Sequence, residues 1–97
     1  MKIATGNRLA HYQIEYNELI EQTTLLNQTL IYKQQEYQVL CNYFSVNQGD
    51  KNARTRLNKS ARDIKSLRSN IERNKRRMLT LQRQMKIEMN KVYGRRH

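Results

Sequence analysis

Three side chains near the start of the chain have the spacing of a helical metal-ligand set. His11, Glu15 and Glu18 are separated by four and three residues, so a helix would place them on one face. A metal site would need further ligands from a second helix. The residues expected to face this region, around Gln82 and Met85, include no histidine or cysteine. We therefore interpret the three side chains as solvated helix surface and expect no metal.

No other combination of residues predicts catalysis. His97 belongs to a short basic tail, and Cys41 has no histidine or carboxylate placed to activate it. The sequence contains no Ser-His-Asp set, no glycine-rich phosphate loop and no paired-cysteine motif. We expect no enzyme activity, no catalytic residues and no cofactor.

The composition favours a small helical protein. The 97 residues include no proline and three glycines, too few turn residues for an all-β fold. No apolar run approaches the roughly 18 residues that a membrane span needs, and the first residues lack the apolar core of a signal peptide. The sequence therefore predicts a cytoplasmic protein without a transmembrane segment.

The glycines divide the chain into two stretches that contain no helix-breaking residue. They lie at Gly6, Gly49 and Gly94. Glycine is the usual left-handed residue just past a helix end, so we expect Gly49 and Gly94 to end two helices. The predicted organisation is a single helical hairpin over residues 1–97. Its parts are a first helix at about 7–47, a turn at 48–50, a second helix at about 51–93 and a basic tail at 94–97.

Polar residues at the expected helix starts can cap them. Thr5 or Asn7 can accept a backbone N–H bond at the start of the first helix, and Asp50 or Asn52 can do so at the second.

Apolar residues follow the 3,4 alternation of a coiled coil on both helices, without interruption. On the first helix the a and d positions are Leu9, Tyr12, Tyr16, Leu19, Thr23, Leu26, Leu30, Lys33, Tyr37, Leu40 and Phe44. On the second they are Leu57, Ser60, Ile64, Leu67, Ile71, Asn74, Met78, Leu81, Met85, Glu88 and Val92.

The two rows come into register when the chain folds back beside Gly49. In that register each a position faces a d position; Phe44 meets Ala53, and Thr23 meets Asn74 as a polar pair. The sequence therefore predicts an all-α fold in which two long helices form an antiparallel coiled-coil hairpin.

A second apolar row lies on the first helix, away from the predicted seam. Leu25, Tyr32, Val39 and Val46 occupy successive c positions of the heptad. Scattered surface hydrophobic residues are normal, but a strict repeat of seven favours a seam for a partner helix. The partner is either another protein or a second copy of the chain.

Charge is concentrated in the second half of the chain. Residues 1–49 hold three basic and four acidic residues, whereas residues 50–97 hold sixteen basic and four acidic residues, a net charge of +12. This excess predicts an anionic partner, either an acidic protein surface or nucleic acid. The candidate contacts are Arg62, Arg73, Lys75, Arg76, Arg77, Arg83, Arg95 and Arg96.

These patterns favour a structural adaptor hairpin that docks into a larger assembly. A nucleic-acid-binding hairpin that contacts phosphates through its second helix is the first alternative. Binding to anionic lipid is less favoured, because the apolar residues of the second helix are committed to the seam. The two-helix architecture is also similar to that of the small basic stalk proteins of type III secretion and flagellar export. This resemblance covers the hairpin and no motif, and it implies a stalk-like component of an export ATPase complex.

Overall fold

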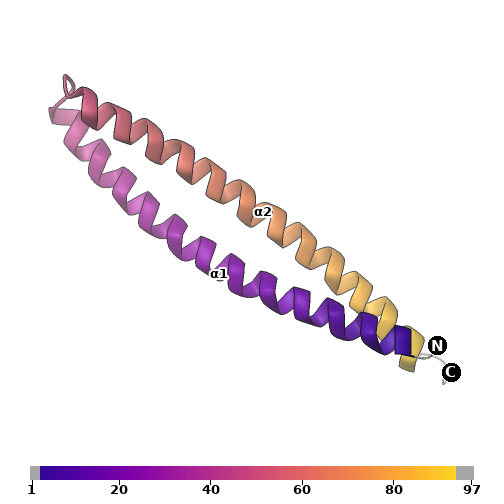
Figure 1. Ribbon diagram of the computed structural model, residues 1–97. Coiled ribbons are helices and arrows are strands. Elements are labelled where there is room, and N and C mark those ends of the chain that lie inside the picture. The colour runs from indigo at the N-terminus through magenta and orange to yellow at the C-terminus, as the bar shows by residue number, and fades with distance from the viewer. Residues whose placement is uncertain (1–2, 94–97) are drawn as a thin grey trace. The chain divides into compact units, whose positions relative to one another are not determined.

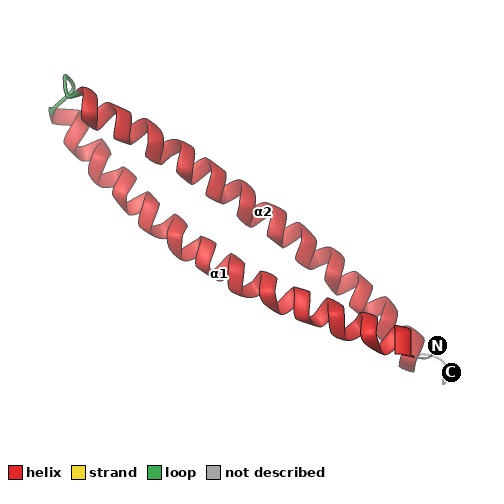
Figure 2. Cartoon of the chain, in the orientation of Figure 1, coloured by secondary structure: helices red, strands yellow, loops and turns green. Residues whose placement is uncertain are grey.

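Two long helices account for nearly all of the chain that the structure describes. The computed structural model describes residues 3–93, with side chains from Asn7 to Tyr93. Helix α1 spans Ile3–Val46 and helix α2 spans Lys51–Tyr93, and a short turn joins them (Figure 1). No strand occurs among residues 3–93 (Figure 2). The predicted all-α hairpin of two antiparallel helices is confirmed.

The hairpin divides into two compact units, each built from a pair of antiparallel helical segments. The turn unit, Thr24–Glu72, contains the second half of α1, the turn and the first half of α2. The terminal unit pairs residues 3–23 of α1 with residues 73–93 of α2. Ion pairs cross between the helices inside each unit, from Lys33 to Asp63 in the turn unit and from Glu15 to Arg77 in the terminal unit.

The predicted a and d positions form the interface between the helices. All of those from Leu9 to Phe44 on α1 are buried or half-buried, as are all from Ala53 to Glu88 on α2. The most deeply buried apolar residues are Leu40, Ala53, Ile64, Ile71 and Leu81.

One predicted seam residue does not belong to the interface. Val92, one residue before the end of α2, is 46% exposed. The seam therefore ends at Glu88.

A polar layer interrupts the seam in the terminal unit. Thr23 is buried, and its hydroxyl lies 3.9 Å from Met78 Sδ, a weak acceptor. Asn74 is half-buried. Both predicted polar residues are thus covered in the seam, but the hydroxyl of Thr23 is directed to Met78 rather than to Asn74.

Among the described residues, neither the polar cap expected at the start of α1 nor the glycine cap expected at its end is found. Helix α1 begins at Ile3 and continues through Gly6, so neither Thr5 nor Asn7 precedes it. Gly49 does not adopt a left-handed conformation, because no described residue has a positive φ. Gly94 lies outside the described residues.

Asparagine replaces glycine in closing the end of α1. The side-chain Nδ2 of Asn47 donates to the carbonyl of Tyr43 at 2.9 Å, and its backbone N–H donates to Phe44 O at 3.2 Å. The backbone N–H of Asp50 then donates to Asn47 O at 3.0 Å. The carbonyls of Tyr43 and Phe44, in the last turn of α1, are thus satisfied without a left-handed residue.

Asp50 caps the start of α2, as one of the two predicted candidates. Its Oδ1 accepts from the backbone N–H of Ala53 at 3.1 Å, and its Oδ2 accepts from the Tyr43 hydroxyl at 2.8 Å. These bonds lower the pKa of Asp50 below its ordinary value of 3.8, the bond from Ala53 having the largest effect.

A carboxylate occupies the last layer of the seam. Glu88 is 4% exposed; its Oε1 lies 3.8 Å from Arg8 Nη1 and 3.5 Å from Lys91 Nζ. Its Oε2 is buried and has no hydrogen-bond partner among the described residues, and the same holds for Gln84 Oε1 one turn earlier. Burial of an unsatisfied acceptor opposes folding.

The turn geometry predicts that Gly49→Ala is tolerated. A Cβ built at Gly49 would have no atom within 4 Å, and the backbone there needs no positive φ. Compared with the wild type, the free energy of unfolding of the variant should be unchanged or higher by up to about 1 kcal/mol, because alanine restricts the unfolded chain. Thermal melts followed by circular dichroism measure this. A clear drop in melting temperature would mean that Gly49 is a left-handed cap after all.

Loss of the Asp50 cap should lower the melting temperature of Asp50→Ala by several degrees at pH 7. Because the folded-state pKa of Asp50 is lowered, its stabilising effect is present above pH 3.8 and fades as the pH falls through the folded-state value. The difference in melting temperature between the wild type and Asp50→Ala should therefore become smaller at acidic pH. Asp50→Asn, which can still cap, is the control and should lose less. Equal melting temperatures at pH 7 would contradict the assignment.

Removal of the buried carboxylate in Glu88→Leu should stabilise the fold by about 1–3 kcal/mol. Leucine suits this seam position, and Arg8 and Lys91 are exposed enough to be solvated once their partner is gone. Urea titration gives the change in unfolding free energy, with Glu88→Gln separating the effect of charge from that of polarity. A destabilised leucine variant would show that the carboxylate is satisfied by its basic neighbours.

Candidate partner-binding surfaces

The second apolar row of α1 is exposed along its whole length. Leu25, Tyr32, Val39 and Val46, hereafter the c row, are between 62% and 81% exposed. All four belong to the turn unit. In a coiled coil the heptad repeat keeps such residues on one side of the helix. The c row is therefore a line of apolar side chains without cover in the described chain.

The two helices differ in how their apolar residues are distributed. Helix α1 carries one apolar row in the seam and another at the c positions. In the turn unit, α2 places its large apolar residues only at the seam, and its other positions are polar or charged apart from Ala61. A helix that is apolar on more than one side is typical of a helix with more than one neighbour.

An apolar groove lies between the helices of the turn unit, beside the c row. Its volume is about 490 Å³. Leu40 and Ala53, both buried, line it together with the exposed Tyr32, Val39 and Tyr43. The small side chain of Ala53 leaves space where a larger seam residue would fill it. The groove and the c row share Tyr32 and Val39 and so form one continuous surface.

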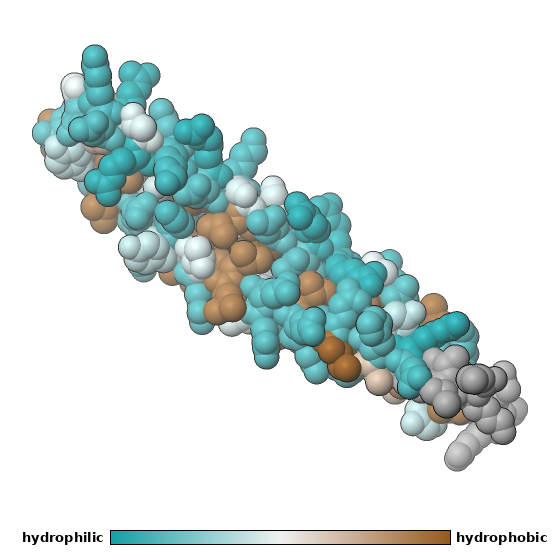
Figure 3. All heavy atoms as spheres, in the orientation of Figure 1, coloured by the Kyte–Doolittle hydropathy of each residue, from teal (hydrophilic) through white to brown (hydrophobic). Residues whose placement is uncertain are grey.

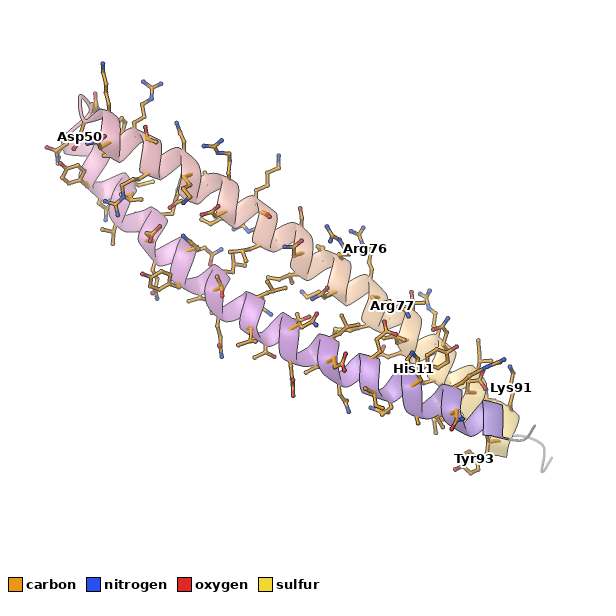
Figure 4. The ribbon with its side chains drawn as sticks, viewed as in Figure 1. His11, Asp50, Arg76, Arg77, Lys91 and Tyr93 are labelled. Atoms are coloured by element: carbon orange, nitrogen blue, oxygen red, sulfur yellow. The ribbon has the colours of Figure 1, made fainter. Side chains whose placement is uncertain are left out.

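The Tyr43 side chain is held in place as a wall of this groove. Its hydroxyl donates to Asp50 Oδ2 at 2.8 Å, which ties the end of α1 to the cap of α2 (Figure 4). This hydrogen bond to the carboxylate raises the pKa of Tyr43. Tyr43 therefore stays neutral at physiological pH.

Three charged side chains line the groove, Asp50, Glu36 and Arg56. Glu36 Oε1 accepts from the Ser60 hydroxyl at 2.8 Å, and Lys33 Nζ lies 3.6 Å from the same oxygen. The bond from Ser60 is the main cause of the lowered pKa of Glu36. Lys33 also pairs with Asp63 at 3.4 Å. Arg56, on the α2 side, is exposed and belongs to none of the ion pairs of the described residues.

The predicted anion-binding residues separate into four groups, the last of which is Arg77 alone. Arg62, Arg73, Arg76 and Arg83, hereafter the basic face, are exposed and take part in none of the ion pairs among the described side chains. Lys75 is exposed beside a shallow groove that Tyr16, Met78, Leu79 and Gln82 also line. Arg95 and Arg96 lie outside the described residues.

Arg77 is engaged within the fold, unlike the basic face. Its Nε and Nη2 donate to the two carboxylate oxygens of Glu15 at 2.7 and 2.9 Å. This pairing lowers the pKa of Glu15 and raises that of Arg77. Figure 4 shows the neighbouring Arg76 directed away from α1, whereas Arg77 reaches toward it. Arg77 therefore joins the helices of the terminal unit.

The possible metal ligands are not brought together. Glu15 is bound to Arg77, while His11 and Glu18 are exposed and Cys41 is half-buried. Among the described residues no group of three or more His, Cys, Asp or Glu side chains could hold a metal ion.

Sequence reasoning did not single out the groove residues Tyr43 and Arg56. Both occupy g positions beside the seam, and an exposed aromatic residue at such a position was an available signal. It also did not single out the exposed apolar residues Leu79 and Ile87 of α2, which follow no heptad row. Neither described helix is long and apolar enough to cross a membrane.

Comparison with models of protein families, with curated proteins and with solved structures finds no match to this chain. The candidate surfaces are therefore interpreted from their own geometry and charge.

Proposed function

We propose that this chain is a non-enzymatic structural adaptor, a coiled-coil hairpin that docks into a larger assembly through the c row of α1 and the basic face of α2. The observation that carries the proposal is the exposed c row, with its strict spacing of seven residues. A row of this kind is typical of a helix that packs against a further helix.

Burial of the c row by a partner would contribute to the stability of the complex. Full burial of one large apolar side chain contributes about 1.5–3 kcal/mol. The hairpin leaves the four side chains of the c row in water. A partner helix along this row would gain this contribution from several side chains at once, which supports docking through α1.

The charge of α2 supports an anionic region in the same assembly. Residues 50–97 carry a net charge of +12, and the arginines of the basic face take part in none of the ion pairs among the described residues. Removal of like-charge repulsion by an acidic protein surface would favour binding.

The unpaired arginines also favour nucleic acid as a second candidate partner. A hairpin that contacts several phosphates would lose affinity steeply and linearly on a plot of log affinity against log salt concentration. Titration of the full chain with generic duplex and single-stranded nucleic acid tests this alternative. A shallow salt dependence would leave an acidic protein surface as the anionic partner.

The adaptor proposal predicts that the c row has the larger effect on assembly. We expect replacement of its four residues by glutamine to release the tagged protein from its native complex in host cells, as measured by size-exclusion chromatography. Replacement of the basic face by glutamine should weaken the complex less, because exposed charges are screened at physiological salt.

Matched variants control for lost hydrophobicity and lost charge. Ile14 and Ile31 are similarly exposed but lie outside the c row, so their replacement by glutamine should leave the complex intact. Replacement of Lys51, Arg54, Lys65 and Lys86 gives the same net charge as the basic-face variant. A complex that survives loss of the c row would contradict the proposal.

A further inference from the structure

The groove beside Tyr43 and the adjoining c row together form a candidate docking site for a helix, hereafter the seat. The length and chemistry of this surface indicate the class of partner. We infer that it receives a third helix, amphipathic in sequence, with an apolar side against the c row and an acidic edge against Arg56. This inference rests on the proposed function, because it specifies the partner that the c row would dock.

The apolar part of the seat is longer than the groove itself. Tyr32 and Val39 belong both to the groove and to the c row, which continues to Leu25 on one side and Val46 on the other. At 1.5 Å per residue, Leu25 and Val46 are roughly 31 Å apart along α1. An elongated apolar surface of this length fits about three heptads of a helix better than a compact small molecule.

The floor of the groove is deep enough for side chains to enter. Leu40 and Ala53 are 7% and 5% exposed, yet both line it. Large residues of a third helix could therefore pack between Tyr43 and the α2 side, as knobs do in a three-helix coiled coil. The bond from Tyr43 to Asp50 fixes this wall, so little ordering is needed on binding.

The charges along the groove favour an acidic partner. In the α2 segment of the turn unit, residues 51–72, seven side chains are basic and two are acidic. One of those acids, Asp63, is paired with Lys33. Two further acids line the groove itself. Glu36 is bound to Ser60 and Lys33. Asp50 is bound to Tyr43 and to the backbone N–H of Ala53. Arg56 forms no ion pair among the described residues. Its charge acts on Glu36 at longer range, as the smallest of the effects that lower the pKa of Glu36. An acidic edge on the third helix would meet Arg56 directly.

A second copy of the chain fits this seat poorly. Its own c row lies on residues 24–46 of α1, which contain one acidic residue, Glu36, and one basic residue, Lys33. Docking of two c rows would supply no excess of acid and would bring two strongly basic α2 helices into one complex. Charge complementarity therefore favours a different, acidic chain.

The test uses the full chain and designed helical peptides of about four heptads as probes. The first peptide has leucine at its a and d positions and glutamate at its e and g positions. A second replaces the glutamates by lysine, and a third scrambles the first to destroy its apolar side. Fluorescence anisotropy at about 0.3 M salt measures affinity where weak attraction between exposed charges is screened.

We expect the acidic amphipathic peptide to bind at least about tenfold more tightly than either of the other two. Val39→Gln should weaken its binding about tenfold, and Arg56→Gln about threefold. Ile31→Gln, an equally apolar change outside the seat, should have less than about a twofold effect. Circular dichroism confirms that each variant keeps its helicity, and the milder Val39→Ala serves if Val39→Gln does not fold.

Several results would overturn the inference. Equal binding of the scrambled peptide, or binding unaffected by Val39→Gln and Arg56→Gln, would show that the groove is not the seat. If the chain alone forms a dimer, and the Val39→Gln variant is a monomer, the seat is occupied by a second copy of the chain. If nucleic acid displaces the peptide, and Val39→Gln no longer binds nucleic acid, the seat is a nucleic-acid site.

These failures are distinguishable from failure of the proposed function. Suppose that no peptide binds, but the c-row variant is still released from the native complex. The adaptor proposal then stands, and the inferred class of partner is wrong. Suppose instead that the peptide binds in the groove, but the native complex survives replacement of the c row. The docking site then exists but is not used in that assembly.

Discussion

Burial of one residue row from each helix is the interaction on which the rest of the structure depends. Neither helix has an apolar core of its own, and most of each surface remains in water. The antiparallel arrangement, the position of the turn and the identity of the g positions beside the seam all follow from which rows meet. Those g positions supply Glu15, Arg77, Tyr43 and Arg56, the side chains that join the helices or line the groove.

Several polar residues stand in or beside this seam, and they differ in how well they are satisfied. Ser60, almost fully buried, donates to Glu36 across the helices. Among the described residues, the hydroxyl of Thr23 has only a sulfur as its partner, and one carboxylate oxygen of Glu88 has none. Satisfied polar layers help to fix register, whereas unsatisfied ones oppose folding. The turn-unit seam is thus better satisfied than the last layers of the terminal unit.

The division of apolar and charged residues between the helices links stability to function. Helix α1 carries the exposed c row and little net charge, and α2 carries the basic excess with its large apolar residues committed to the seam in the turn unit. Figure 3 shows apolar groups gathered in places on the visible face among predominantly hydrophilic ones. A partner that covers the c row and offers acid to α2 would satisfy both helices, which connects the adaptor proposal to the acidic third helix.

The sequence by itself determined the helices, their antiparallel pairing and the seam, because heptad periodicity depends on residue spacing alone. It also determined that the c row is exposed, since its spacing excludes it from the seam. Only the tertiary structure decided that Arg77 binds Glu15, that Asn47 rather than Gly49 closes α1, and that Ala53 opens a groove beside Tyr43. These features depend on distances between residues far apart in the chain or on the path of a single turn, and side-chain spacing along one helix specifies neither.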